Sequence, residues 1–341
     1  TGENSASPSV NETGTAGEYS AIYTPQNAGT DDISIELQGS PILGSPFTSD
    51  VTVSDISASV STVTASPSEL VVGNASTVTV ELRDGSNNAI TGLSGNDFNL
   101  NVTGNGSDGS ISETSSGTYQ FNVNNTTAQQ VTVTVTAQGV TLDDTPVITF
   151  VAGTATQVTI DSQPAETVAG EPVAGAPAIL LRDSFNNPVP DIEVTISEQG
   201  GQEFAGGDLT VSTNSSGIAA FENALITDAG RYNIVFTAPG GLVITSNAFD
   251  VVPASANASS TTAAVPNGAA GDVTDITITV SDEFGNRVTG EAGNLSVSVN
   301  GANAGATVNE VTDDGNGVYS TGYTPQSTGT DQISIELNGT A

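Results

Sequence analysis

The stretch GEYSAIYTPQNAGTDDISIELQG, residues 17–39, returns as GVYSTGYTPQSTGTDQISIELNG at residues 317–339, with 16 of the 23 positions identical. A weaker copy of the same stretch begins at Gly117. A second motif, a strand that ends in an aspartate, recurs at a spacing of 99 residues, at Asp84, Asp183 and Asp282. Self-similarity at a fixed period is typical of repeat proteins, and about 100 residues is the length of one β-sandwich domain.

Within each period, apolar and polar residues alternate, as in STVTVEL at residues 76–82, QVTVTV at 130–135 and TDITITV at 274–280. Alternation with a period of two predicts antiparallel strands that are buried on one face. Clusters of turn-forming residues, such as DGSNN at 84–88, separate these strands. No segment has the spacing of an amphipathic helix. The sequence therefore predicts an all-β chain of tandem β-sandwich domains.

The repeats also predict where the domains meet. Boundaries fall near Ser54, Ala152 and Pro253, and the linkers there contain no Gly/Ser-rich run. Short linkers couple neighbouring domains closely, so we expect the domains to form an elongated rod. The four expected segments are the C-terminal half of a domain at 1–54, domains at 55–152 and 153–253, and a domain that lacks its last strand at 254–341.

Several motifs resemble two families of Ig-like sandwich. The sequences RDSFNNPVPDIEV at 182–194 and DEFGNRVTG at 282–290 resemble the invasin/intimin type of bacterial Ig-like domain, and TNSSGIA at 213–219 continues that pattern. The segment GEYSAIY at 17–23, together with GSPF at 44–47, is similar to the filamin-type Ig repeat. The resemblance implies tandem Ig-like β-sandwich domains. It also implies the role of a stalk, a spacer or a crosslinking rod.

The composition excludes many kinds of chemistry. The 341 residues contain no Lys, His, Cys, Met or Trp, and the formal net charge is −34. Without imidazole, thiol or amine side chains there is no histidine base, no cysteine nucleophile, no Schiff base and no zinc site built from the usual ligands. A chain this acidic repels the phosphate backbone of nucleic acids. We therefore expect neither an enzyme nor a nucleic-acid-binding protein.

Composition also predicts the location of the chain. It is rich in Ser, Thr, Asn, Gly and Val, and only 12% of its residues are charged, which is typical of a secreted β-protein and not of a disordered acidic tail. The longest apolar run is residues 178–181, far shorter than the about 20 residues of a membrane-spanning helix. We expect the protein to be extracellular or on the cell surface, with no membrane insertion within this segment.

Acidic loops raise the question of calcium. Asp84, Asp183 and Asp282 each begin a loop with Asn or Gly three to four residues later, a pattern that suits either a turn or a group of oxygen ligands for calcium. The turn is the simpler interpretation, because an arginine precedes two of these aspartates.

A second acidic loop is the predicted metal site. DDGNG at residues 313–317 partly resembles a calcium loop, although it lacks the later bidentate glutamate of an EF-hand. The residues proposed to bind Ca²⁺ are Asp313, Asp314 and Asn316. Further acidic pairs occur at residues 31–32 and 143–144. The alternative for every pair is a solvated acidic surface.

Tyrosines recur once in each period, two residues after a glycine. They are Tyr19, Tyr119, Tyr232 and Tyr319. A tyrosine at this place in a sandwich fits a tyrosine corner, in which the phenol bonds to the backbone. The alternative, a surface on which a ligand stacks, fits the recurrence less well.

Together these features predict a non-enzymatic extracellular array, the stalk of a surface adhesin or the shaft of a cell-surface fibre. Its expected partners are neighbouring copies of the same repeat or chain, with a surface glycan or protein as a receptor. One alternative is a filament or surface-layer subunit joined by strand complementation, because residues 1–54 and 254–341 each carry part of a sandwich. The other is an Ig-like module that binds a glycan or a protein.

Overall fold

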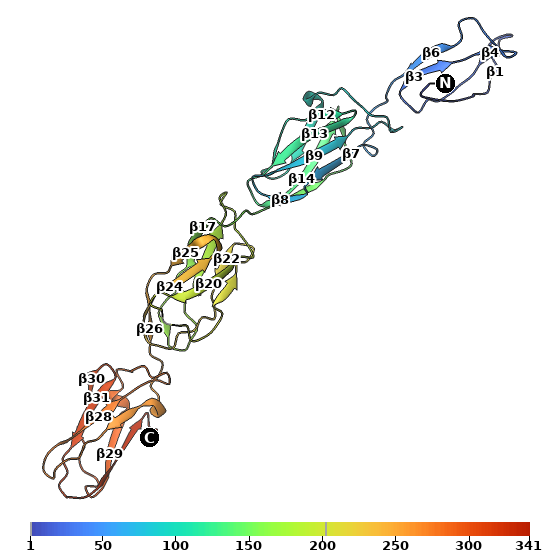
Figure 1. Cartoon of the computed structure of the whole chain (residues 1–341). Coiled ribbons are helices and arrows are strands. Elements are labelled where there is room, and N and C mark those ends of the chain that lie inside the picture. The colour runs from blue at the N-terminus through green and yellow to red at the C-terminus, as the bar shows by residue number, and fades with distance from the viewer. Residues whose placement is uncertain (1, 202) are drawn as a thin grey trace. The chain divides into compact units, whose positions relative to one another are not determined.

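The computed structural model describes residues 2–201 and 203–341 (Figure 1). The chain forms two compact units, Thr1–Gly153 and Thr154–Ala341, and each is described by itself. In the described part of the chain the regular elements are β-strands and four 3₁₀ turns of three residues each. The predicted all-β fold is confirmed.

The first unit contains a complete sandwich from Ile56 onward. Its strands and its 3₁₀ turn are β7 (Thr62–Ser66), β8 (Glu69–Val71), β9 (Ala75–Glu81), η1 (Gly95–Asp97), β10 (Phe98–Val102), β11 (Ser107–Asp108), β12 (Ser112–Ser115), β13 (Thr118–Asn124), β14 (Gln129–Ala137), β15 (Val140–Thr141) and β16 (Val147–Val151). One sheet has the order β10-β14-β16-β8, with β15 beside β14. The other has the order β11-β13-β9-β7, with β12 beside β13.

Alternation along these strands builds the core of the sandwich. In β9 the buried positions include Val78 and Val80, and in β13 they are Tyr119, Phe121 and Val123, while the residues between them face solvent. All five side chains belong to one cluster between the two sheets. The period-two pattern of the sequence therefore predicts the correct inward face of both strands.

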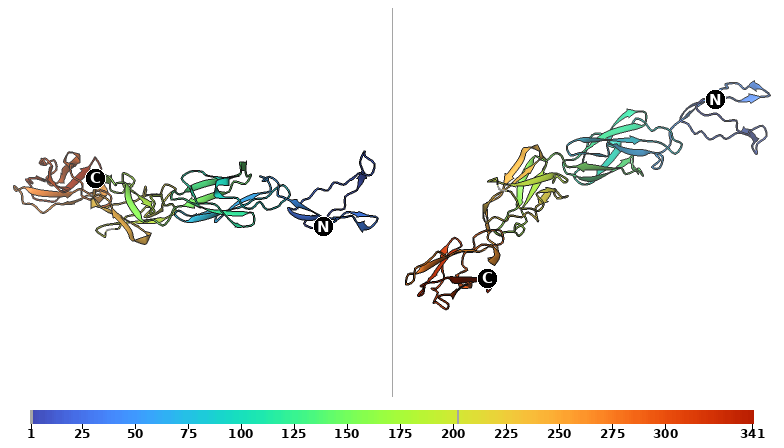
Figure 2. Two further views of the ribbon diagram at one scale, coloured as in Figure 1. Left: turned by 90° about the horizontal axis from the view of Figure 1, so that it is seen from above. Right: turned by 60° about the horizontal axis from the view of Figure 1, so that its bottom comes forward.

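Residues 2–54 of the same unit form three separate strand pairs. Their strands are β1 (Asn11–Glu12), β2 (Tyr19–Ser20), β3 (Gly29–Ile33), β4 (Glu36–Leu37), β5 (Ser40–Pro41) and β6 (Phe47–Val51), paired as β1-β2, β3-β6 and β4-β5. In both views of Figure 2 the two arms of this dark blue segment stay apart. Large apolar side chains are exposed as a result, among them Tyr19 at 64%, Leu37 at 71% and Leu43 at 101%.

The second unit begins with a sandwich whose strands fall into three sheets, β17-β19-β22, β18-β26-β23 and β21-β20-β24-β25. The elements are β17 (Gln157–Ser162), β18 (Thr167–Val168), β19 (Ala178–Arg182), β20 (Glu193–Glu198), β21 (Thr210–Ser212), β22 (Ile218–Ala220), β23 (Gly230–Tyr232), β24 (Ile234–Ala238), η2 (Pro239–Gly241), β25 (Leu242–Thr245) and β26 (Phe249–Val252). Phe221 and Phe236 are fully buried, with ring centroids 5.7 Å apart.

The last segment has two facing sheets, β27-β28-β31-β30 and β29-β32. Its elements are η3 (Ala258–Ser260), β27 (Thr262–Ala264), β28 (Thr274–Thr279), η4 (Ala292–Asn294), β29 (Leu295–Gly301), β30 (Thr312–Gly315), β31 (Val318–Tyr323) and β32 (Asp331–Leu337). Ile276, Ile278 and Tyr319 are fully buried in its core.

The predicted division into four segments is finer than the two compact units and remains a prediction. Among the described residues, no helix has the length and apolar character that a membrane crossing requires.

Candidate functional site

Each period places a buried aspartate at the start of the loop that follows a strand. In the first unit this residue is Asp84, with 2% of its surface exposed. Its Oδ1 accepts hydrogen bonds from the backbone N–H of Ser86 at 2.9 Å and of Asn88 at 2.8 Å. Its Oδ2 accepts from the Asn88 side-chain amide at 2.9 Å. The aspartate and the asparagine four residues later thus close one loop.

The same loop occurs in the other two periods. Asp183 and Asp282 are 1% and 0% exposed, and their carboxylates accept from the backbone and side-chain amides of Asn187 and Asn286. The residue before each asparagine has a positive φ, 70° at Asn87, 70° at Asn186 and 91° at Gly285. Asn and Gly tolerate this backbone better than other residues, which is why they recur there.

The loop of the first unit also holds the segment that precedes its sandwich. The backbone N–H of Ser54, in the linker, donates to Asp84 Oδ2 at 3.1 Å. Asn88 reaches the preceding loop, where its Nδ2 donates to the carbonyl of Gln26 at 2.8 Å and its Oδ1 accepts from the N–H of Ala28 at 3.0 Å. Aspartate and asparagine together therefore bind both the linker and the residues before it.

The second unit repeats this arrangement between its two domains. The N–H of Ala254 donates to Asp282 Oδ2 at 2.9 Å. Asn286 Nδ2 donates to the carbonyl of Thr227, and its Oδ1 accepts from the N–H of Ala229, both at 2.7 Å. We call the Asp84–Asn88 loop and the Asp282–Asn286 loop the junction loops. The partners of both lie in the backbone of the preceding segment.

The carboxylates of the junction loops accept hydrogen bonds as the side chain of a turn-forming aspartate does. Among the described residues, the hydrogen-bond partners of the Asp84 and Asp282 carboxylates are N–H groups, which compete with a cation for the same oxygen lone pairs. Burial would raise the pKa of Asp84. The hydrogen bonds from Asn88, Ser54 and Ser86 outweigh it, because they stabilise the charged form, and lower that pKa from 3.8 to about 2.

This pKa predicts how acid affects the first unit. A carboxyl group whose pKa is lower in the folded chain stabilises the fold fully above its unfolded value near 3.8, and that contribution disappears as the pH falls through about 2. From the size of the shift, the contribution is roughly 2 kcal/mol at pH 6. We expect the difference in free energy of unfolding between wild type and Asp84→Asn, measured by urea titration, to shrink by about that amount between pH 6 and pH 2. A difference that stays constant would contradict this account.

Three of the recurring tyrosines bond to the backbone, as predicted. The Tyr119 hydroxyl donates to the Ile90 carbonyl at 3.1 Å and the Tyr319 hydroxyl to that of Val288 at 2.9 Å. These carbonyls lie just beyond the junction loops, whereas Tyr232 donates to Asp228, four residues before it, at 2.8 Å. Only Tyr232 thus has the short-range bond of a tyrosine corner. Tyr19 is exposed, because its segment forms no closed sandwich.

Replacing Tyr319 by phenylalanine tests the link between core and loop. The change removes the hydroxyl group, which donates a hydrogen bond to the Val288 carbonyl and accepts one from the Glu291 N–H at 2.9 Å. We expect the last domain to lose about 1–2 kcal/mol of unfolding free energy, since two bonds are lost while the ring stays packed. Thermal unfolding of the full chain measures this loss. Tyr19→Phe is the matched control and should have no effect.

The residues predicted to bind calcium lie on one hairpin of the last domain. Asp313 and Asp314 are exposed in β30, and Asn316 occupies the turn that follows, with φ of 52°. Asp313 accepts from the N–H groups of Gly290 and Gly315, and Asp314 from the Ser320 hydroxyl. Across the described residues, no three acidic side chains gather around a common point. Calcium binding here stays a prediction, which titration with CaCl₂ alone can test.

A further polar network was not predicted from the sequence. Asp31 is buried and accepts from the Asn4 backbone and side chain. Asp331 likewise accepts from the backbone and side chain of Asn303, and also from the Tyr323 hydroxyl. The signal was present in the sequence, because Asn303 follows Asn4 by 299 residues within the repeat. Each of the two carboxylates thus accepts three hydrogen bonds.

Paired sheets, recurring junction loops and buried tyrosines define a protein of tandem Ig-like β-sandwiches. Residues 57–153 match the family model of invasin domain 3, and residues 253–341 match that of the filamin/ABP280 repeat. The predicted resemblance to both families is confirmed. The invasin match falls on the second segment, whereas the motifs quoted for that family lie in the third and fourth.

Solved structures of bacterial adhesins have the same fold. FdeC, an adhesin of Escherichia coli, superposes with a TM-score of 0.55 at 19% identity, covering 84% of this chain and 95% of that chain. InvD of Yersinia pseudotuberculosis superposes with a TM-score of 0.50 at 19% identity, covering 82% of this chain and 84% of that one. No curated protein matches the sequence significantly. The chain therefore has the tandem Ig-like fold of invasin/intimin-type adhesins.

Proposed function

We propose that this chain is a stalk segment of a surface adhesin, located outside the cell and without catalytic activity. Its task is to hold other parts of the adhesin at a distance from the surface. Three observations support this role, namely the fold shared with FdeC, the absence of the side chains that most enzymes use, and the junction loops. A protein or glycan receptor for one of the domains remains a prediction.

The junction loops carry the proposal. A stalk needs joints that resist bending, and hydrogen bonds across a short linker restrict its backbone further than the shortness of the linker alone. Asp84 and Asp282 fix the linker N–H groups, while Asn88 and Asn286 fix two backbone groups of the preceding segment. Each junction loop therefore forms three hydrogen bonds that span its joint, and none of them depends on a metal ion.

Small-angle X-ray scattering of the full chain tests the proposal. A stalk should have a radius of gyration well above the roughly 20 Å of a compact 341-residue domain. The double variant Asn88→Ala/Asn286→Ala removes four of the spanning bonds, so its distribution of interatomic distances should broaden. Asn74→Ala, at an exposed position away from the joints, is the matched control. A radius near 20 Å for the wild type would contradict the stalk role.

A further inference from the structure

The junction loop of the second unit carries an aromatic side chain that reaches the preceding domain. Phe284 lies in the middle of the Asp282–Asn286 loop, and its backbone N–H donates to Asp282 Oδ1 at 2.9 Å. A Cβ added at Gly170 would lie 2.6 Å from Cε2 of the Phe284 ring and would also overlap with Cζ. The ring therefore rests directly on the backbone of Gly170, where only glycine leaves room for it.

Gly170 is held in place by its own domain. It belongs to the turn after β18, and its φ of 82° is one that glycine adopts readily. Its N–H donates to the carbonyl of Ile226 at 2.9 Å. This bond ties the turn to residues 226–229, the segment whose backbone binds Asn286. The ring and the asparagine of one loop thus contact two segments that are fixed to each other.

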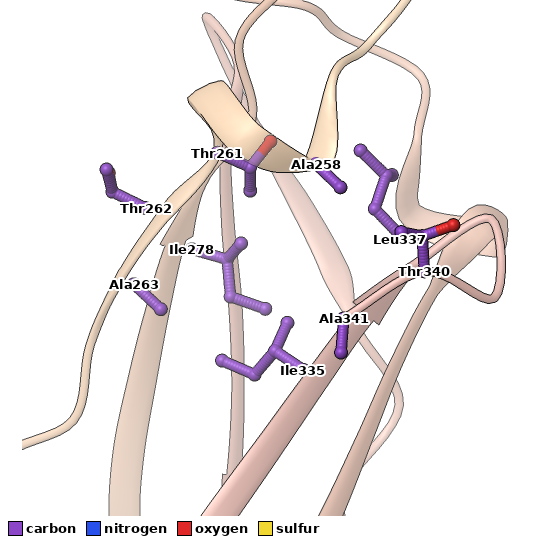
Figure 3. Close-up of a pocket in the computed structure, with 9 residues that line it drawn as sticks. All are labelled: Ala258, Thr261, Thr262, Ala263, Ile278, Ile335, Leu337, Thr340 and Ala341. Carbon is purple, nitrogen blue, oxygen red and sulfur yellow. The ribbon is translucent and has the colours of Figure 1, made fainter.

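The linker is held in the same way on the side of the last domain. The Asn257 N–H donates to the carbonyl of Ser281, the residue before the junction loop, at 2.8 Å. Ala258, in η3, packs against the core of the last domain. Figure 3 shows Ala258 among the residues that line a pocket of this domain, together with Ile278. Flexibility at the joint is therefore confined to the few residues between β26 and Asn257.

The contacts of the junction loop reach three separate segments. Asp282 binds the linker at Ala254, and Asn286 binds Thr227 and Ala229. The Phe284 ring rests on the turn that contains Gly170. Two points of contact leave a body free to rotate about the line that joins them, whereas a further contact away from that line stops the rotation.

The other junction loop has a small side chain at the position of Phe284. Ser86 stands there, and its N–H donates to Asp84 Oδ1 at the same distance of 2.9 Å. The loop therefore closes with serine as well as with phenylalanine, so closure does not explain the ring. Phe284 is also 39% exposed, so it is not a core residue of its domain. The contact with Gly170 is what distinguishes phenylalanine from serine at this position.

We propose that Phe284 is a positioning residue that blocks rotation at the joint between the two domains of the second unit, with Gly170 as its socket. The hydrogen bonds of the junction loop hold the two domains together, and the ring fixes the angle at which they meet. This inference deepens the stalk role and rests on it, because a stalk has to resist twisting as well as bending.

Distances between two spin labels on the full chain test the proposal. The chain contains no cysteine, so Ser197→Cys in β20 and Ser298→Cys in β29, both at exposed positions, place one label on each domain. Pulsed electron paramagnetic resonance then measures the distribution of distances between the labels. We expect Phe284→Ser to make this distribution roughly twice as wide, since domains that share only a small interface move relative to each other. Val243→Ser, at an exposed apolar position of β25, is the matched control and should leave the width unchanged.

A second pair of variants tests the contact itself. Gly170→Ala puts a methyl group where the ring lies, so it should also widen the distribution. In the double variant Gly170→Ala/Phe284→Ser the methyl group has no ring to displace, so the distribution should be no wider than that of Phe284→Ser alone. Gly240→Ala controls for backbone strain, because Gly240 has φ of 78° and nothing lies within 4 Å of an added Cβ. It should leave the distribution unchanged.

The outcomes separate this inference from the stalk role. A wild-type distribution that is already broad would contradict both, because the joint would then not be stiff. A narrow wild-type distribution that stays narrow in Phe284→Ser would overturn this inference alone. The inference also fails if Gly170→Ala widens the distribution further when the ring is absent, because the glycine would then act without Phe284.

Discussion

Replacing Asp84 by alanine is expected to lower the unfolding free energy of the sandwich in the first unit by about 3 kcal/mol or more. The change removes a buried carboxylate and leaves without a partner the N–H groups of Ser54, Ser86 and Asn88. Charge-assisted hydrogen bonds contribute more than neutral ones, and the variant loses all the bonds that this carboxylate accepts at once. Urea unfolding of the full chain, followed by tyrosine fluorescence, measures the loss.

The same variant should also release the joint. Hydrogen–deuterium exchange of peptides that cover residues 24–30 and 52–56 should become faster, because the loop no longer fixes Asn88 and Ser54. Asn88→Ala separates the two effects. It keeps the bonds that Asp84 accepts from backbone N–H groups, so it should accelerate exchange near Ala28 at a smaller cost in stability.

Asp108→Ala is the matched control for Asp84→Ala, because Asp108 is an exposed aspartate of the same sandwich. Its effect should stay within about 0.5 kcal/mol, as is usual for surface positions. Equal losses for the two variants would show that the junction loop contributes nothing special to stability.

Replacing Gly217 by alanine should destabilise the first sandwich of the second unit by about 3 kcal/mol. Gly217 has φ of 76°, and an added Cβ would lie 2.6 Å from the Leu181 carbonyl oxygen and 3.0 Å from the Val189 nitrogen. Both neighbours are backbone atoms on either side of the Asp183–Asn187 loop, so they cannot move without shifting it. The left-handed backbone adds strain of about 1 kcal/mol for any residue with a side chain.

Gly240→Ala in the same sandwich is the control. Gly240 has a similar φ of 78°, but nothing lies within 4 Å of an added Cβ. This variant should therefore lose only about 1 kcal/mol of unfolding free energy, which is the cost of a side chain on the left-handed backbone. The difference between the two variants, measured by thermal unfolding, isolates the steric clash. If the two variants lose the same unfolding free energy, the contact between an added Cβ at Gly217 and the neighbouring backbone atoms has no energetic consequence.

Much of the fold could be predicted because it depends on local pattern. Alternation places Val78 and Val80 inward, and both are fully buried. The period of the repeat aligns Asp84 with Asp282, and the two residues form the same loop. Such features follow from the chemistry of neighbouring residues, which a single sequence displays.

Other features depend on contacts between distant residues, which no local pattern contains. Asn286 bonds to backbone groups of Thr227 and Ala229, more than 50 residues earlier, and nothing in its own surroundings identifies them. Tyr19 and Tyr319 occupy the same position of the repeat, yet one is 64% exposed and the other is fully buried, because only the second has facing strands. Calcium and N–H donors compete for the same carboxylates, and the sequence alone does not show which of them is nearby.

The junction loops have a consequence for how such arrays change over time. Asn88 and Asn286 each contact one carbonyl and one N–H two residues apart in the preceding segment, and both groups belong to the backbone. This mode of contact makes no demand on the identity of the side chains there. These hydrogen bonds would therefore survive the deletion, duplication or exchange of whole domains by recombination, whereas the contact of the Phe284 ring with Gly170 requires a glycine in the preceding domain.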